Sequence, residues 1–252
     1  MYEMDKILTV ESMTISFGGF NAVRDLSFDV YQGEILGTIG PNGAGKTTFL
    51  NGLTGLVKLA RGRVVFNGHD ITHLSPSRRC HLGIGRTYQV PRPFVGMSVF
   101  ENVLVGAEHG ASLGGKDARE KALEILTLTG LMDKKNLLAG RLDLLDRKRL
   151  EVARALATNP TLLLLDEVAA GLTEAEVGEL IDIVKGIKNS GVTIIWIEHV
   201  LQTMREAADR LLCLSAGQLL TCGDPHEVLA SEAVQECYLG VEEVEVEQVE
   251  LN

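Results

Sequence analysis

The stretch Gly40-Pro41-Asn42-Gly43-Ala44-Gly45-Lys46-Thr47-Thr48 decides the fold of this 252-residue chain. It matches the phosphate-loop pattern G-x-x-x-x-G-K-[ST], in which backbone N–H groups surround the phosphates of a nucleotide. The Lys46 side chain is expected to reach the β- and γ-phosphates, and the Thr47 hydroxyl to bind Mg²⁺. At average glycine usage such a pattern arises by chance in a chain of this length only about 1% of the time. The sequence therefore predicts a site for ATP or GTP.

The residues on both sides of this loop favour the same interpretation. The apolar segment 35–39 predicts a buried strand that enters the loop, and residues 46–56 predict the helix that leaves it. A helix N-terminus carries unpaired N–H groups and partial positive charge, so it favours a bound anion. A glycine-rich turn without a ligand is the less favoured alternative.

Length and composition predict a soluble α/β protein. A chain of 252 residues with 45% hydrophobic content suits one α/β domain that carries an inserted subdomain. No apolar run approaches the roughly 20 residues that a membrane-spanning helix needs. The start, Met1–Asp5, is acidic where a signal peptide carries positive charge, so a cytosolic chain is expected. Any work at a membrane would then involve docking on another protein.

The net charge and the cysteine spacing argue against a nucleic-acid-binding surface and against a metal site. The net charge of −10 disfavours general nucleic-acid binding, which usually needs a basic surface. The basic clusters 78–79 and 147–149 lie in helical patterns without interleaved aromatic residues, so they are expected to be solvated helix faces. The four cysteines (Cys80, Cys213, Cys222 and Cys237) have no C-x-x-C spacing. They are expected to be free thiols in a reducing compartment rather than metal ligands.

The order of predicted elements indicates a parallel sheet with helices on its faces. Strands are expected at 7–17, 26–30 and 63–66. A mostly helical middle, interrupted by a loop at 111–115, runs from about 99 to 156. The last third alternates strands and helices, which is typical of a parallel sheet; the strands are expected at 162–165, 192–197 and 211–214 and the helices at 174–188 and 201–208.

The end of the chain has a different composition. Residues 241–252 alternate valine with acidic residues in part, and a disordered acidic tail is the favoured interpretation. An edge strand or a contact with a partner is the alternative. The pattern predicts no function for this tail.

A second strand supplies the carboxylates that a phosphate loop needs. The segment Leu162–Glu167 has four leucines followed by two acids. Asp166, at the strand end, is expected to hold Mg²⁺ through water. Glu167 is expected to polarise or deprotonate the water that attacks the γ-phosphate.

Two more residues follow predicted strands and are candidates for the same chemistry. His199 follows the apolar run 194–197, and the carboxyl edge of a parallel sheet is where ligands bind. It is therefore a candidate sensor of the γ-phosphate, although a lone histidine is often structural. Gln89 follows a short strand pattern and is expected to approach Mg²⁺ and the attacking water.

The order of these motifs resembles the ATP-binding subunit of an ABC transporter, from about Leu8 to Gly240. Within that superfamily, residues 83–89 followed by 97–103 are similar to the LivG type, and so is the ending 237–240. LivG-type proteins are the ATPases of branched-chain amino acid importers, and close relatives serve urea and amides.

The resemblance implies a fold, cofactors and partners. The fold is a P-loop ABC ATPase domain over residues 6–240: a RecA-like core with a parallel sheet and an antiparallel β subdomain (6–90 and 157–240), and an inserted α-helical subdomain (about 91–156). The cofactors are ATP and Mg²⁺, with Thr47, Gln89 and Asp166 around the metal and Phe17 stacked on adenine. The partners are permease subunits, a second ATPase of the LivF type and a solute-binding protein, and the location is the inner face of the cell membrane.

One segment departs from the family pattern. ABC ATPases work as head-to-tail dimers in which a signature segment, L-S-G-G-Q or often L-P-Y-G-Q, closes the partner's site. Here Leu142–Asp146 occupies that position with the sequence L-D-L-L-D. The carboxylates of Asp143 and Asp146 would lie near an anionic phosphate, and the two leucines restrict the close backbone approach that glycine allows. One of the two aspartates is also expected to cap a helix that starts near Arg147.

Two smaller departures follow the catalytic glutamate. Val168 replaces a usual proline, and Thr173 replaces a usual aspartate. The residues that bind this chain's own nucleotide are thus intact, whereas those that it lends to a partner are degenerate. A heterodimer follows as a hypothesis: this chain's ATP would be hydrolysed normally, and the partner's ATP, facing 142–146, would turn over slowly or not at all.

Three alternatives remain beside the importer. The first is a homodimeric exporter ATPase of the lipopolysaccharide-transport type, which the signature loss disfavours. The second is a soluble ABC-type ATPase acting on DNA or ribosomes, for which the chain lacks coiled-coil inserts and a second ATPase half. The third is a regulatory subunit that no longer hydrolyses nucleotide, against which the retained Glu167 and His199 argue.

Overall fold

The computed structural model describes residues 5–238, which form two compact units. Unit 1 combines the chain up to His73 with the chain from Ile197 onward, and unit 2 comprises Leu74–Trp196. The expected subdomain boundaries near residues 90 and 156 stay a prediction. The acidic tail at 241–252 lies outside the described residues. None of the helices within the described range is long and apolar enough to cross a membrane.

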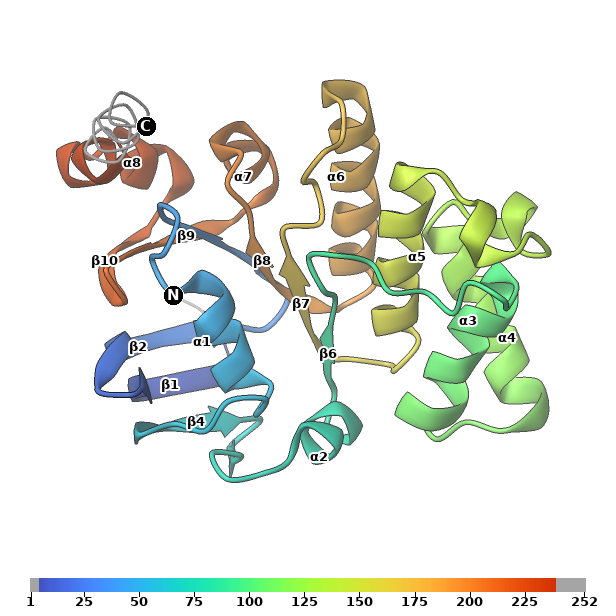
Figure 1. Cartoon of the computed structure of the whole chain (residues 1–252), viewed down its shortest axis with the longest axis horizontal. Helices are drawn as coiled ribbons and strands as arrows, with labels where there is room; N and C mark the ends of the chain where they lie inside the picture. The colour runs from blue at the N-terminus through green and yellow to red at the C-terminus, as the bar shows by residue number, and fades with distance from the viewer. Residues whose placement is uncertain (1–4, 239–252) are drawn as a thin grey trace. The chain divides into compact units, whose positions relative to one another are not determined.

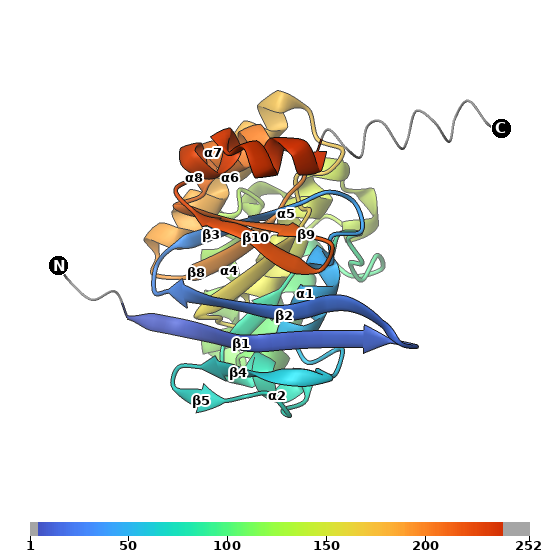
Figure 2. The same ribbon diagram turned by 90° about the vertical axis from the view of Figure 1, so that its left-hand side faces the viewer.

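Unit 1 contains an antiparallel sheet with the strand order β2-β1-β4-β5 (Figure 2). The two long strands β1 and β2 pair through a tight turn at Gly18-Gly19. In the second half of β2 the buried residues Leu26, Phe28 and Val30 alternate with more exposed ones, as expected for a sheet with one covered face, whereas β1 has a continuous buried run at 13–15. The strands are β1 (Lys6–Phe17), β2 (Phe20–Tyr31), β4 (Arg61–Phe66) and β5 (His69–Asp70).

Unit 1 also contains the strand and helix that flank the phosphate loop. Every residue of β3 (Ile35–Ile39) is buried, and this strand pairs in parallel with β9 (Arg210–Ser215). The antiparallel strand β10 (Gln218–Gly223) continues the sheet beyond β9. The helices are α1 (Lys46–Leu53), α7 (Leu201–Ala207), α8 (Pro225–Ala230) and a last turn at 232–238.

Aromatic packing joins α1 to the antiparallel sheet. The ring of Phe49 on α1 lies edge-on to the ring of Phe28 on β2, with 5.4 Å between centroids and 80° between planes. Phe49 is fully buried, and its neighbours on the same helix face, Leu50 and Leu53, are buried as well. The helix that follows the phosphate loop is therefore fixed to the antiparallel sheet by a hydrophobic contact close to its N-terminus.

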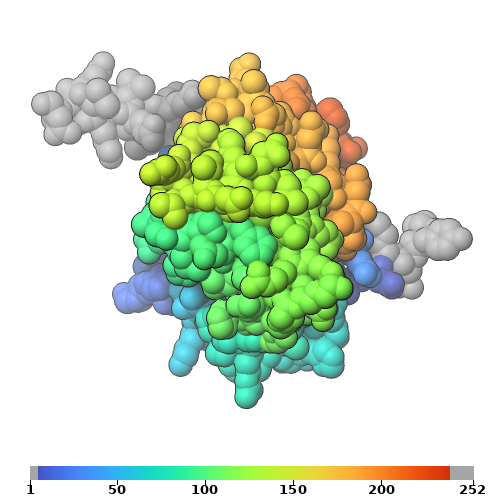
Figure 3. Space-filling view, turned by 90° about the vertical axis from the view of Figure 1, so that its right-hand side faces the viewer, coloured from blue at the N-terminus to red at the C-terminus, as the bar shows by residue number. Residues whose placement is uncertain are grey.

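Unit 2 combines short strands with most of the helices found within residues 5–238. Its strands have the order β8-β7-β6, and β6 pairs in parallel with β7. Helices α3, α4 and α5 contact one another, and Figure 3 shows the surface that this helical region presents. The strands are β6 (Ile84–Arg86), β7 (Leu162–Asp166) and β8 (Thr193–Ile197), and the helices are α2 (Pro76–His81), α3 (Val99–Val105), α4 (Gly115–Leu128), α5 (Leu144–Leu156) and α6 (Glu174–Asn189), with short π- or 3₁₀-turns at Gly106–Gly110, Met132–Lys134 and Ala139–Arg141 (Figure 1).

Most expected elements are present, and a few boundaries differ. The helix after the phosphate loop ends at Leu53 instead of residue 56, and α5 begins at Leu144, three residues before the expected start. Strand β10 and helix α8 were not expected from the sequence. The expected loop at 111–115 ends one residue earlier, at Gly114, because α4 begins at Gly115.

The expectation that the two basic clusters are solvated was wrong for several of their residues. Arg79 is only 2% exposed, and its Nε donates to the carbonyl of Leu74 at 3.1 Å. Lys148 is 3% exposed and is bonded to two carbonyls. Their long side chains reach carbonyl groups inside the fold, and these hydrogen bonds offset the cost of burying a charge.

Truncation of Phe49 tests the contact that holds α1. Phe49→Ala is expected to lower the free energy of unfolding by about 3–5 kcal/mol, because it removes a buried ring and leaves a cavity. Urea titration followed by circular dichroism measures the change. Phe20, which is 70% exposed, provides the matched control, since Phe20→Ala is expected to stay within about 0.5 kcal/mol of wild type. Equal effects of the two substitutions would contradict this assignment.

Candidate nucleotide-binding site

The backbone of the phosphate loop requires its glycines. The loop connects β3 to α1, and Gly43 and Gly45 have φ angles of 78° and 95°, in the left-handed region that favours glycine. Gly45 also packs closely, since a Cβ atom on it would lie 2.5 Å from the carbonyl oxygen of Ala22. The N–H groups of the first turn of α1 therefore follow a sharp bend that other residues would not adopt without strain.

The Lys46 ammonium lies across the start of this loop. The side chain is buried, and Nζ donates to the carbonyls of Gly40 at 2.6 Å and Pro41 at 3.1 Å. Thr47 is exposed and Thr48 is half-buried on the same helical turn. Phosphate oxygens are stronger acceptors than carbonyls, so the arrangement suits an ammonium that meets an anion at the loop.

His199 lies in the same unit as the loop. Glu198, which precedes it, is buried, and its N–H donates to the carbonyl of Thr38 at 3.3 Å. Thr38 belongs to β3, two residues before Gly40. The His199 side chain is 52% exposed, and its Nδ1 lies 3.8 Å from the Glu198 carboxylate. The segment after β8 is thus fixed to the strand that enters the loop, and the imidazole remains accessible.

Phe17 is accessible at the end of β1. It pairs with Phe20 across the turn to β2, and half of its surface is exposed. An exposed aromatic ring on a rigid strand end is a suitable platform for stacking a base. Its outer neighbour Phe20 is even more exposed, so this end of the hairpin presents two rings to solvent.

In unit 2, Asp166 forms a buried ion pair that the sequence analysis missed. Its carboxylate accepts from Nη2 of Arg86 at 2.9 Å, and both side chains are buried. Asp166 ends β7 and Arg86 ends β6, two parallel neighbours whose carboxyl ends share one edge. That shared edge is the signal in the sequence that could have identified Arg86.

Glu167 and Gln89 face one another in the same unit. The Gln89 side-chain amide donates to the Glu167 carboxylate at 2.6 Å. Glu167 has a φ of 47°, which is uncommon for a residue other than glycine and indicates a strained backbone. Such strain persists where the surroundings fix the backbone, and the hydrogen bond from Gln89 helps to hold Glu167 in this conformation.

Lys148 of α5 joins the backbones of these two residues. Its Nζ donates to the carbonyls of Gln89 at 2.9 Å and Glu167 at 3.2 Å. One buried ammonium therefore connects the segment after β6, the segment after β7 and helix α5. No pattern in the sequence indicated this role, because Lys148 stands within a basic run on a helix.

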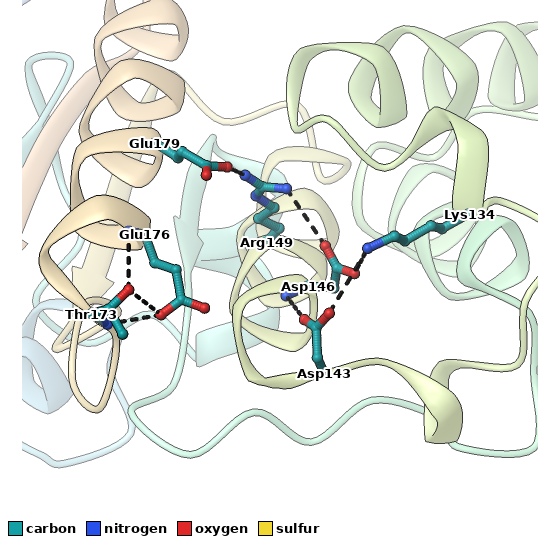
Figure 4. Close-up of polar contacts among 7 residues, drawn as sticks. All are labelled: Lys134, Asp143, Asp146, Arg149, Thr173, Glu176 and Glu179. Atoms are coloured by element: carbon teal, nitrogen blue, oxygen red, sulfur yellow. Dashed lines mark hydrogen bonds and ion pairs between the residues drawn. The ribbon is translucent and has the colours of Figure 1, made fainter.

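The N-terminus of α5 is occupied by the chain's own carboxylates (Figure 4). Asp143 is the N-cap, and its side chain accepts from the N–H of Asp146 at 2.9 Å. Asp146 is buried and forms ion pairs with Lys134 and with Arg149, which also pairs with Glu179. The bond to Asp146 is the main cause that raises the pKa of Lys134. The expected capping is thus confirmed for Asp143.

The two smaller departures also have local explanations. Thr173 is the N-cap of α6, where its hydroxyl accepts from the N–H of Glu176 and the Glu176 carboxylate accepts from Thr173 in return. Together these two reciprocal hydrogen bonds form a capping box (Figure 4). Val168 is fully buried. Both residues therefore stabilise the fold where they stand.

A family model described as "ABC transporter" matches residues 23–170. The chain belongs to the ABC transporter family. The LivG protein of Methanocaldococcus jannaschii, described as a probable branched-chain amino acid transport ATP-binding protein, is 36% identical over 95% of this chain and all of its own length. The LivG protein of Escherichia coli K12 is 33% identical, over 93% of this chain and 98% of its own.

A second branch of the ABC transporter family is similarly close. The lipopolysaccharide export system ATP-binding protein LptB of Haemophilus influenzae is 34% identical, over 93% of this chain and 97% of its own. Among solved structures, an ABC transporter cassette in its ADP conformation has a TM-score of 0.87 at 34% identity, over 94% of this chain and 99% of its own. These neighbours confirm the predicted fold, an α/β P-loop ABC ATPase domain.

The predicted site residues of this ABC ATPase divide between the two units. Unit 1 holds Phe17, the loop from Gly40 to Thr48, and His199, whereas unit 2 holds Gln89, Asp166 and Glu167. Within the described residues, the four cysteines are free thiols, and no group of three or more His, Cys, Asp or Glu residues could hold a metal ion.

Substitution of Lys148 tests whether its ammonium positions Gln89 and Glu167. Lys148→Met is expected to reduce the kcat for ATP hydrolysis about tenfold, because misplaced reacting groups slow a reaction strongly. The Kd for ATP is expected to stay within about twofold, because the two carbonyls to which the Lys148 ammonium donates belong to Gln89 and Glu167 and not to the phosphate loop. Steady-state hydrolysis in the assembled complex and a fluorescent-nucleotide titration measure the two quantities.

The exposed Lys185 on α6 provides the control for this substitution. Lys185→Met removes the same charge from the same unit and is expected to leave kcat unchanged. If Lys148→Met weakened ATP binding and hydrolysis in parallel, the lysine would support the fold in general rather than these two residues.

Proposed function

We propose that this chain is the ATP-hydrolysing subunit of an ABC importer of small solutes, with branched-chain or related amino acids as the favoured substrates. The observation that carries the proposal is the match to LivG proteins along nearly the whole chain. The ATP-binding subunit of such a system would lie at the inner face of the membrane, against permease subunits, and a solute-binding protein would deliver the substrate.

The chemistry proposed for unit 1 is nucleotide binding. Backbone N–H groups from Gly40 to Thr48 would surround the phosphates of ATP, with the Lys46 ammonium on the β- and γ-phosphates. Phe17 would stack on adenine, and His199 would contact the γ-phosphate. The buried position of Lys46 and the exposed faces of Phe17 and His199 support these roles.

The chemistry proposed for unit 2 is activation of water. Glu167 would act as the general base, oriented by the amide of Gln89, which already donates to its carboxylate. Gln89 and Asp166 offer an amide and a carboxylate oxygen, and Thr47 of unit 1 offers a hydroxyl; such oxygen atoms are the ligands that Mg²⁺ prefers. When bound, Mg²⁺ neutralises charge on the phosphates. Arg86 would hold the Asp166 carboxylate in a fixed orientation.

The partner proposed for this chain is a different ATPase subunit, of the LivF type. In a head-to-tail dimer, the N-terminus of α5 would face the partner's γ-phosphate. Asp143 already accepts the N–H of Asp146 there, and two carboxylates stand at the same helix end. Two like charges roughly 4 Å apart repel by about 1 kcal/mol in water and about 4 kcal/mol at an effective dielectric constant of about 20. This repulsion favours a heterodimer in which the site that holds the partner's ATP is impaired.

A second candidate is the ATPase of a lipopolysaccharide exporter, which the match to LptB favours. The two candidates differ in the composition of the ATPase dimer. An exporter of this type would be a homodimer and would carry the L-D-L-L-D segment in both sites. Self-association with ATP therefore separates the two candidates.

Blocking hydrolysis shows whether the chain pairs with itself. Glu167→Gln is expected to bind ATP and to remain monomeric alone, because the carboxylates at α5 oppose a second γ-phosphate. Size-exclusion chromatography with light scattering, with and without ATP, measures the mass, and a fluorescent ATP analogue shows that nucleotide is bound. A tight ATP-dependent dimer would instead support the homodimeric candidate.

Restoring the signature provides the converse test. Asp143→Ser with Leu144→Gly and Leu145→Gly, in the Glu167→Gln background, is expected to allow an ATP-dependent dimer. Serine is also a good N-cap, so the start of α5 is retained, while the glycines let the partner's phosphate approach. Asp146 is left in place because its ion pairs are buried. The control combines the same substitutions with Lys46→Ala and should give no dimer. If the variant that retains Lys46 also failed to dimerise, the defect would lie outside residues 143–145.

A further inference from the structure

The phosphate loop has a hydrogen-bond partner near the end of the described chain. The hydroxyl of Tyr238 accepts from the N–H of Gly40 at 2.8 Å, across 198 positions of sequence. Tyr238 is the last described residue of the helical turn 232–238 and is half-buried. Gly40 is the first residue of the phosphate loop. A residue outside every predicted site motif therefore contacts the point where β3 becomes the loop.

Gly40 is held on three sides. Besides its N–H contact with Tyr238, its carbonyl accepts from the Lys46 ammonium at 2.6 Å. A Cβ atom at this position would lie 2.2 Å from the carbonyl oxygen of Leu214, so the backbone of β9 presses directly against it. Gly40 thus links the Tyr238 hydroxyl to Lys46, the lysine that is proposed to bind phosphate.

The residue before Tyr238 docks on the strand beside the loop. The thiols of Cys237 and Cys213 influence each other's pKa, so the two side chains are neighbours. Cys213 lies on β9 in register with Ile39, the residue immediately before Gly40. Burial raises the pKa of Cys213 to about 12, so this thiol stays protonated at neutral pH. The helical turn is therefore bonded to the start of the loop through Tyr238, and its neighbour Cys237 lies beside the strand next to the loop.

Burial also raises the pKa of Tyr238 above that of a solvated phenol. The hydroxyl consequently remains neutral at physiological pH, and its oxygen accepts the Gly40 N–H without adding negative charge beside the phosphates. A carboxylate in the same place would accept the N–H equally well, but it would repel the nucleotide. A phenol is chemically suited to a contact at an anion site.

We propose that Tyr238 is a positioning residue for the phosphate loop: its hydroxyl fixes Gly40, and through the Gly40 carbonyl it fixes the Lys46 ammonium, in the orientation that receives the phosphates of ATP. The proposal rests on the nucleotide-binding function proposed above for the loop. Its physical basis is preorganisation, since a loop that is already ordered loses less entropy when the ligand binds. The C-terminal turn then contributes to nucleotide affinity without touching the nucleotide.

The test is Tyr238→Phe, which removes only the hydroxyl oxygen. The ATP dissociation constant is expected to rise about three- to tenfold, the range that corresponds to one hydrogen bond at a buried N–H. The kcat at saturating ATP is expected to change less than about twofold, because no group that contacts the attacking water is altered. Hydrogen exchange without nucleotide, followed by mass spectrometry, is expected to become faster in the peptide that covers Gly40–Lys46.

Tyr31→Phe is the matched control within unit 1. The Tyr31 ring lies under the Arg210 guanidinium, with 4.9 Å between the guanidinium carbon and the ring centroid, and this contact does not need the hydroxyl. The control is expected to leave both the ATP dissociation constant and the exchange of the loop unchanged. Tyr238→Leu, which also removes the ring, is expected to weaken ATP binding more than Tyr238→Phe does.

The outcomes separate this proposal from the one on which it rests. Unchanged loop exchange in Tyr238→Phe overturns the positioning role, and so does faster exchange spread evenly over unit 1, which indicates general loosening. An unchanged ATP dissociation constant overturns the link to affinity. If the wild-type chain did not bind ATP at all, the proposed nucleotide-binding function would fail, while faster exchange confined to the loop would still support the contact between Tyr238 and Gly40.

Discussion

The hydrogen bonds from the Lys46 ammonium to the carbonyls of Gly40 and Pro41 are the interaction on which the candidate nucleotide site depends. They close the turn between a fully buried strand and a helix fixed by the Phe28–Phe49 contact. Glycine is required at Gly43 and Gly45, where φ is positive, and at Gly40, where a Cβ atom would collide with the backbone of β9. The loop is therefore a rigid connection between two packed elements, and its N–H groups have fixed directions before any nucleotide arrives.

Unit 2 also contains a buried lysine whose ammonium donates to two backbone carbonyls. The buried ammonium of Lys148 donates to the carbonyls of Gln89 and Glu167, as Lys46 does to two carbonyls in unit 1. In both cases a charge is removed from water and stabilised by backbone acceptors, which makes its loss costly and its position well defined. The strained backbone of Glu167 is maintained by this surrounding network. Each half of the proposed chemistry thus has its own buried cation.

The start of α5 illustrates how a functional segment can be replaced by a structural one. A signature segment leaves helix N–H groups available to a phosphate, whereas here Asp143 caps the helix and Asp146 is paired with Lys134 and Arg149. The substitution gives a well-capped helix with compensated charges. The same change that favours the fold of this chain makes its helix end unsuitable for a second anion, which is why the proposal turns on a different partner subunit.

The sequence by itself determined the phosphate loop, the buried strands and the candidates Glu167 and His199, because these depend on short motifs and local hydrophobic patterns. It left open which aspartate caps α5, and it misjudged Arg79 and Lys148, because charge alone does not show whether a side chain reaches an internal carbonyl. Arg86 at Asp166 and Tyr238 at Gly40 were decided only by the tertiary structure. These contacts join residues 80 and 198 positions apart, and no local pattern in the chain records which distant groups the packing of strands and helices brings together.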